Sequence, residues 1–178
     1  MIESFPFETI GDEREAQERE RFLTSHRALA ICAREFGRLA DEITDRVVEL
    51  GRELGIDEAP ETRLTPERCI VQLGPVALTV AWLRSTIDSV AEGRLLVIAW
   101  QGTVAKRRMA QAPERSLAAK ATQTAVPVWE ETLAATGISE ETWAWRPESD
   151  ENQLVGSTEL ATRCVKQLRS ALASSIRS

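Results

Sequence analysis

The first long pattern in the chain is a helical stripe. Apolar side chains recur at intervals of three, four and seven residues between Phe22 and Leu54, and this spacing places side chains on one face of an α-helix. The stripe consists of Phe22, Leu29, Cys32, Phe36, Leu39, Ile43, Val47, Leu50 and Leu54. The d-type positions of a heptad turn polar at Arg46 and Glu53, so the pattern indicates a straight helix on a flat surface and not a coiled coil.

The predicted helix extends on both sides of this stripe. Asp12 followed by Glu15 fits a capping box, and Gly55 fits a C-terminal cap, so one long helix is expected over residues 12–55. Residues 12–21, DEREAQERER, have Ala16 as their one apolar side chain. This charged extension is either a solvated end of the helix or a surface that docks a partner.

Two segments show the period-two alternation of β-strands: VALTVAWLRS, residues 76–85, and RLLVIAWQGTV, residues 94–104. A three-residue loop at 91–93 would join them into a hairpin in which Trp82 faces Gly102 and Arg84 faces Trp100. The even-numbered apolar residues of both strands would then share the core face.

The opposite face of this hairpin is also partly apolar. It would carry Leu83, Leu95 and Val97 beside small residues of the first strand. Such an apolar patch must be covered by a second helix, a partner or a loop.

The other strands are shorter or less regular. CIVQL (69–73) and TWAWRPE (142–148) are expected strands, and ATQTAVPVWEE (121–131) is expected to be a strand with Pro127 at an edge or bulge. Residues 131–137 are expected to form a helical turn before Gly137.

A final helix is expected over 157–174, where Leu160, Cys164, Leu168 and Leu172 form a stripe. The fold class is therefore α+β, a single domain over 1–178 with a long N-terminal helix, a C-terminal helix and helices packed on the sheet. The sheet, over 68–147, is antiparallel and meander-like, with about five strands.

Composition agrees with a globular protein. The chain has 178 residues, of which 43% are hydrophobic and 28% charged, which suits one domain with its own core. The apolar runs fall short of the roughly 18 residues of a membrane span, and the N-terminus is acidic where a signal peptide is basic, so we expect a cytoplasmic protein. Cys32, Cys69 and Cys164 are far apart and are expected to be reduced, buried thiols.

Charge is distributed unevenly along the chain. The net charge is −6, and the acidic excess belongs to residues 1–62. Bases gather instead in residues 101–125, which contain Lys106, Arg107, Arg108, Arg115 and Lys120. A loop of this charge can contact phosphate or an acidic protein surface, although it lacks the interleaved aromatic residues of a single-strand binder.

Recognisable catalytic chemistry is sparse. The one histidine, His26, has polar neighbours on the first helix, and the chain has no GxSxG, GxxxxGK[ST], GxGxxG or HExxH motif. We therefore expect no metal and no cofactor, and a binding protein more than an enzyme.

Three classes of function follow from these features. The first is a protein–protein interaction or assembly subunit, as a homodimer or within a hetero-complex, that uses the charged helix and the basic loop. The second is a nucleic-acid-associated accessory protein that uses the basic segment 106–120. The third is a small-ligand binder or enzyme with a tryptophan-lined site.

The candidate residues divide accordingly. The candidate partner-binding residues are Lys106, Arg107, Arg108, Arg115, Lys120, Phe22, Leu23, Leu83, Leu95 and Val97. The candidate ligand face consists of Trp82, Arg84, Trp100, Trp143 and Trp145.

Overall fold

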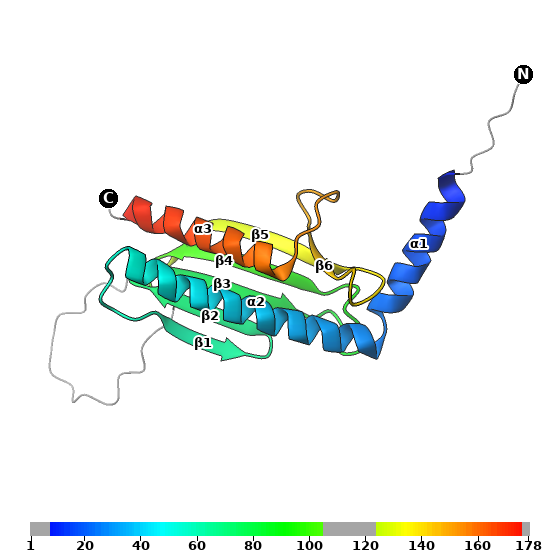
Figure 1. Cartoon of the computed structure of the whole chain (residues 1–178), viewed down its shortest axis with the longest axis horizontal. Coiled ribbons are helices and arrows are strands. Elements are labelled where there is room, and N and C mark those ends of the chain that lie inside the picture. The colour runs from blue at the N-terminus through cyan, green and yellow to red at the C-terminus, as the bar shows by residue number, and fades with distance from the viewer. Residues whose placement is uncertain (1–7, 105–123, 176–178) are drawn as a thin grey trace, which may run out of the picture.

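The computed structural model describes residues 8–104 and 124–175 and has an α+β architecture (Figure 1). Its elements in chain order are α1 (Glu8–Leu23), α2 (His26–Glu53), β1 (Glu61–Thr65), β2 (Arg68–Leu73), β3 (Val76–Leu83), β4 (Arg94–Gln101), β5 (Val126–Thr136), β6 (Ala144–Pro147) and α3 (Ser157–Ser175). The expected α+β class, with an N-terminal and a C-terminal helical part around a sheet, is confirmed.

The N-terminal helical part is two helices and not one. The Ser25 side chain accepts a hydrogen bond from the Ala28 backbone N–H at 3.2 Å and has extended backbone angles, so it is the N-cap of α2. The carbonyl of Leu23, at the end of α1, accepts a hydrogen bond from Val90 N–H at 3.0 Å. The prediction of one helix was wrong because this cap interrupts it, and α1 projects from the body (Figure 1).

The end of α2 follows the predicted cap. Gly55 has a positive φ of 66°, and the N–H of Ile56 donates to the carbonyl of Gly51 at 2.9 Å. A glycine tolerates this left-handed conformation without strain. The chain then leaves the helix and turns towards the sheet.

The six strands form one antiparallel meander in the order β1-β2-β3-β4-β5-β6. The expected sheet of about five strands missed β1, because Glu61–Thr65 is mostly polar and exposed. The expected helical turn after residue 131 was also wrong, since β5 continues to Thr136 and pairs with both β4 and β6. The expected irregularity at Pro127 is confirmed by a register shift between Ala99 and Trp100, opposite that part of β5.

The β3–β4 pairing differs from the predicted hairpin. Val76 pairs with Gln101 and Trp82 pairs with Leu95, so the connection spans residues 84–93 and is longer than three residues. This register reverses the parity of β4 relative to β3. The helix-facing side of β4 carries Leu95, Val97 and Ala99, and the other side carries the even-numbered residues.

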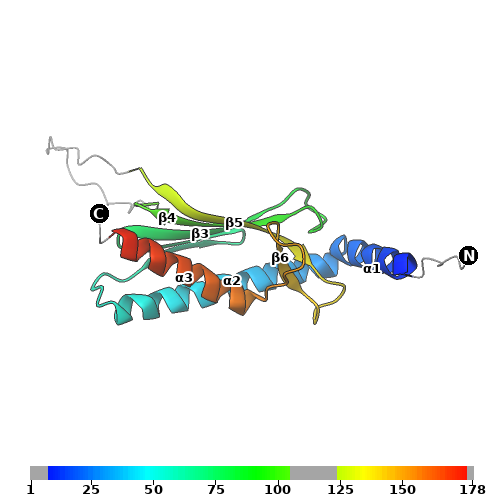
Figure 2. The same cartoon turned by 90° about the horizontal axis from the view of Figure 1, so that it is seen from above.

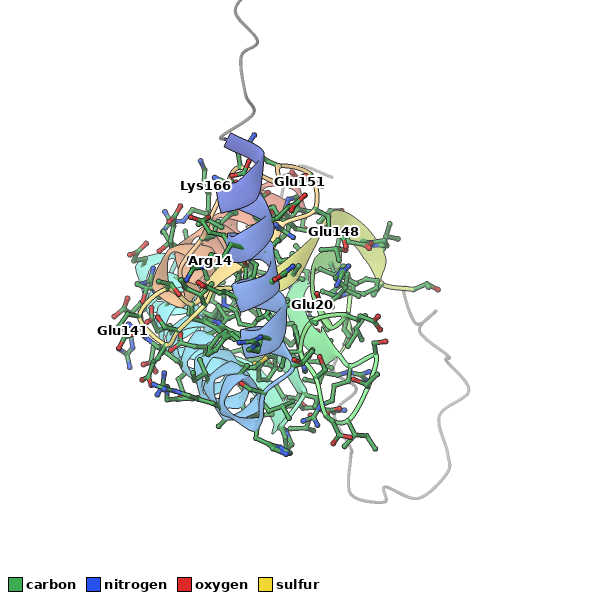
Figure 3. The ribbon with its side chains drawn as sticks, turned by 90° about the vertical axis from the view of Figure 1, so that its right-hand side faces the viewer. Arg14, Glu20, Glu141, Glu148, Glu151 and Lys166 are labelled. Carbon is green, nitrogen blue, oxygen red and sulfur yellow. The ribbon has the colours of Figure 1, made fainter. Side chains whose placement is uncertain are left out.

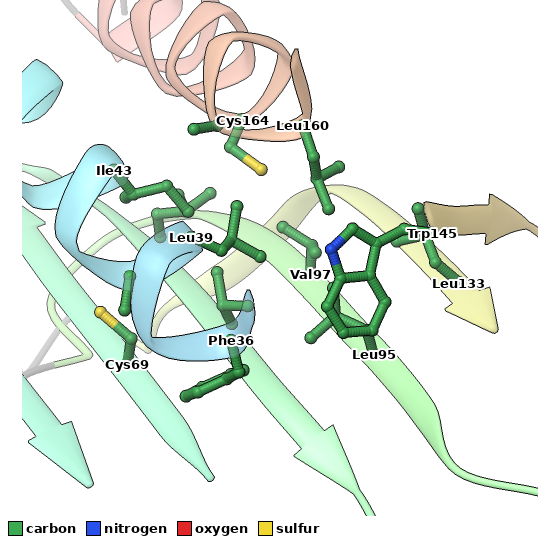
Figure 4. Packing of buried hydrophobic residues seen from close by; sticks show 14 of the residues in the cluster. Phe36, Leu39, Ile43, Cys69, Leu95, Val97, Leu133, Trp145, Leu160 and Cys164 are labelled. Carbon is green, nitrogen blue, oxygen red and sulfur yellow. The ribbon is translucent and has the colours of Figure 1, made fainter. Parts of the chain in front are cut away.

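Both long helices lie on the same side of the sheet (Figure 2). The interior between the two layers is filled by aliphatic side chains from α2, α3 and the strands, with Leu39, Ile43, Leu95 and Leu160 all at most 1% exposed (Figure 4). Each fully buried side chain of this size contributes about 1.5–3 kcal/mol to stability. One side of the sheet is thus committed to the core, and neither α2 nor α3 covers the other side.

Candidate interaction surface

The sheet side that α2 and α3 leave uncovered, here called the open face, is apolar at its centre. In the strand registers, Ile70, Thr79 and Ile98 form one row across β2, β3 and β4. Adjacent rows on the same face add Leu96, Trp100 and the 47%-exposed Leu83. Ile70, Leu96, Ile98 and Trp100 are half-buried by their neighbours within the sheet. The centre of the open face is therefore a nearly continuous apolar patch.

Trp100 is held in place on this patch. Its indole N–H donates to the Thr79 hydroxyl at 3.0 Å, which draws the ring from β4 towards β3. The bond satisfies the polar atom of the indole inside the sheet surface while the ring remains partly exposed. A fixed aromatic ring of this kind loses little conformational entropy when a partner covers it.

Charged side chains border the apolar patch on both sides. Arg68 lies on β2 in the row of Leu96, and Glu130 lies on β5 opposite Ile98. Both are exposed, and neither forms an ion pair with another described residue. An Arg94–Glu148 pair at 2.5 Å borders the end of the face near β6. The face therefore has an apolar centre and a charged rim, as protein interfaces do.

The structure separates the predicted partner-binding residues. Leu83 is on the open face, but Leu95 and Val97 are fully buried beneath the helices, so the prediction that the three share one face was wrong. The error follows from the β3–β4 register, which exchanges the two faces of β4. Leu23 is 6% exposed and Phe22 packs against the core, so both attach α1 to the body.

The basic residues Lys106, Arg107, Arg108, Arg115 and Lys120 lie outside the described residues. The charged extension of residues 12–21, here called the charged arm, lies within α1, and Arg14 and Glu20 project from it (Figure 3). Arg14 pairs with Glu18 within the arm at 3.3 Å. The prediction that the arm docks a partner stays a prediction.

The tryptophans do not form one face. Trp82 and Trp145 lie in the core with ring centroids 5.8 Å apart, and Trp143 meets Trp145 edge to face at 5.6 Å. The expected core position of Trp82 is confirmed by its 6% exposure. Trp100 alone among these lies on the open face.

Arg84 also departs from its expected place. It follows the last residue of β3 and pairs with Glu67 at 2.6 Å, so it does not lie opposite Trp100. A hollow of about 400 Å³ beside it is lined by Arg68, Trp82 and the β1–β2 turn. The Arg84 guanidinium is already paired with Glu67, so Arg68 is the charged side chain among the lining residues that has no described ion pair.

Three polar contacts tie the helices to the sheet and to each other. The indole N–H of Trp145 donates to the Ser157 hydroxyl at 3.1 Å, and that hydroxyl donates to Glu35 Oε2 at 2.8 Å. Arg163 on α3 pairs with Glu131 on β5 at 3.0 Å. Sequence analysis missed this network, since residues far apart in the chain form it and only the tertiary structure brings them together.

The described residues offer little catalytic or metal chemistry. Within them, no group of three or more His, Cys, Asp or Glu side chains could hold a metal ion. Burial raises the pKa of the Cys32 thiol to about 12 and that of Cys69 to about 11, so neither is a nucleophile at neutral pH. None of the described helices combines the length and the apolar character needed to cross a membrane.

Comparison of the chain with protein-family models, with curated proteins and with solved structures finds no match.

Proposed function

We propose that this protein is an interaction or assembly subunit whose contact surface is the open face of the sheet. The observation that carries the proposal is the apolar patch around Ile98 and Trp100, on the side of the sheet that α2 and α3 leave uncovered. An exposed apolar patch with a polar rim is typical of a protein–protein contact site.

The anatomy of the face supports a specific contact. Tryptophan and arginine are the residues that most often dominate binding energy at interfaces, and here Trp100 is fixed by Thr79 while Arg68 stands at the rim. The contact would bury side chains whose rotamers are already restricted by packing against their neighbours in the sheet. Binding therefore costs less conformational entropy than it would on a loop.

The charged arm has a subordinate role in this proposal. Residues 12–21 of α1 are almost all exposed and polar, and exposed ion pairs contribute about 0–1 kcal/mol each. The arm can steer a partner by its charge, but the apolar face supplies the stable contact.

The nucleic-acid alternative finds no support on this face. Its rim carries both Arg68 and Glu130, whereas phosphate recognition favours a surface whose charges are all positive. The small-ligand alternative is weakened, because Trp82 and Trp145 lie in the core and the half-buried Trp143 packs against it.

The proposal is tested by site-specific photo-cross-linking from the open face. A photoreactive amino acid replaces Ile98 in one variant and Ile87 in a matched control, because Ile87 is 81% exposed but lies in the β3–β4 connection. The proposal expects a discrete cross-linked species, identified by mass spectrometry, from position 98 and not from position 87.

A second pair of variants adds an independent readout. Ile98→Glu should remove the associated species while the circular dichroism spectrum remains that of the folded protein. Ile87→Glu should change neither association nor fold. Equal cross-linking from both positions, or undiminished association of Ile98→Glu, would refute the open face as the contact surface.

A further inference from the structure

Within β2–β5, the open face carries two charged residues without a described ion pair, and they stand on opposite sides of the apolar patch. Arg68 stands on β2 and Glu130 on β5, with the central strands β3 and β4 between them. The two residues are in adjacent rows, because Arg68 shares a row with Leu96 while Glu130 is opposite Ile98. A surface with a cation on one flank and an anion on the other can be complementary to a copy of itself.

A closed dimer requires a two-fold axis, and only some orientations satisfy these charges. When two open faces stack with the axis parallel to the strands and between β3 and β4, β2 of each copy lies over β5 of the other. Arg68 then approaches the partner's Glu130 twice in the dimer. An axis across the strands would instead place β2 over β2 and β5 over β5, so that Arg68 could not reach the partner's Glu130.

The stacking also covers the apolar residues. With this axis β4 of one copy lies over β3 of the other, so Leu96 and Ile98 cover the partner's Ala81 and Thr79. Face-to-face sheets pack about 10 Å apart with their strands about 30° from parallel. The extended arginine side chain can span the single-row offset of about 6.8 Å between Arg68 and the partner's Glu130.

The size of the face suits a stable dimer. Strands β2–β5 are about 19 Å across and about 27 Å long, which gives a footprint of about 500 Å². Side-chain relief makes the accessible area of each partner larger than this footprint, so it approaches the roughly 800 Å² per partner of a standard interface.

From these observations we propose that the open face binds a second copy of this chain, in a two-fold homodimer whose axis runs along β3 and β4. Arg68 of one protomer pairs with Glu130 of its partner. This inference rests on the proposed function, because it names the partner of the same surface.

Charge exchange between purified proteins tests the inference. Light scattering coupled to size exclusion should show a concentration-dependent dimer of two 19.8 kDa chains. Arg68→Glu and Glu130→Arg should each raise the dissociation constant of the dimer by about tenfold, because each variant places two like-charge contacts in the dimer. The double variant should recover the original affinity.

The two single variants provide a sharper test when mixed. A heterodimer of Arg68→Glu with Glu130→Arg has opposite charges at both contacts, so an equal mixture should form heterodimers, detected with an affinity tag on one variant. Lys166→Glu and Glu49→Arg, exposed charge reversals on the helix layer, are matched controls and should leave the dimer unchanged.

The outcomes separate this inference from the proposed function. A chain that stays monomeric at every concentration, or a dimer indifferent to both charge reversals, overturns the homodimer. If position 98 then still cross-links to a different protein, the proposed function stands while the homodimer fails. If position 98 captures nothing and the chain is monomeric, both fail.

Discussion

Gly93 allows the most direct test of the packing beneath the sheet. A Cβ atom added to Gly93 would overlap Trp82 Cζ2 and lie 2.7 Å from Cη2 and 3.1 Å from Cε2 of the same indole. Optimal carbon–carbon separation is about 3.5–4.0 Å, so the indole would have to move by about 1 Å. Trp82 is 6% exposed and contacts Trp145, which leaves little space for that movement.

The expected cost of Gly93→Ala is that of an overpacked core. Such insertions typically cost about 1–3 kcal/mol, and the aromatic contact on the far side of Trp82 favours the upper half of that range. For a chain of this size about 2–3 kcal/mol corresponds to a fall of about 4–12 °C in melting temperature.

Gly37→Ala is the matched control. Gly37 lies within α2, and a Cβ added there would meet nothing within 4 Å. Replacing a glycine by alanine within a helix stabilises by about 0.5–1 kcal/mol. The same chemical change is thus expected to have opposite signs at the two glycines.

Urea unfolding followed by circular dichroism would measure both variants at one fixed protein concentration, because dimerisation makes stability depend on concentration. Trp82→Phe removes the Trp82 ring atoms that the added Cβ would overlap. In this background Gly93→Ala should therefore cost at least about 1 kcal/mol less than it does beside Trp82. A Gly93→Ala variant as stable as Gly37→Ala, or a cost that Trp82→Phe leaves unchanged, would refute the overlap argument.

Three further predictions concern the core, a polar contact and acid stability. Leu95→Glu should destabilise the fold by more than about 4 kcal/mol, because it buries a carboxylate, while Leu96→Glu on the open face should stay folded and lose association; thermal melts and light scattering distinguish them. Ser157→Ala should lower the free energy of unfolding in urea by about 1–3 kcal/mol, since it leaves the buried indole N–H of Trp145 without its acceptor. Ser170→Ala, at an exposed position of α3, should lower it much less. The hydrogen bond from Thr158 to Glu42, supported by Arg38 and Arg46, lowers the pKa of Glu42. A folded pKa below the unfolded one stabilises above the unfolded pKa, and this contribution is lost as pH falls through the folded value. When the pH falls from about 5 to about 3, the urea midpoint of Thr158→Val should therefore decrease less than that of the unmodified protein. An equal decrease in the two proteins would contradict this.

Local patterns determined much of the helical layer. The three- and four-residue spacing from Phe22 to Leu54 predicted the face that α2 buries, and Gly55 marked its end, because both signals depend on residues within a few turns. The stripe of α3 from Leu160 to Leu172 was equally readable. The helix break at Ser25 was missed since the apolar spacing continues across it, although a serine cap was the available signal.

The candidate interaction surface depended on the tertiary structure. Both alternating sets of β4 are apolar, Leu95 and Val97 on one side and Leu96 and Ile98 on the other, so alternation located the strand but could not say which side faces the helices. That choice is made by the ten-residue span 84–93 and the resulting pairing of Trp82 with Leu95.

Sequence alone therefore determined the apolar faces of α2 and α3 and located two strands near Trp82 and Trp100 that carry apolar residues on both sides. Only the fold decided that Trp82 enters the core and Trp100 stays on the open face. The physical reason is that strand periodicity is two, so one step in register exchanges the faces. The register goes with the ten-residue connection 84–93 and with the packing of α2 and α3 on one side of the sheet, and short-range spacing encodes neither.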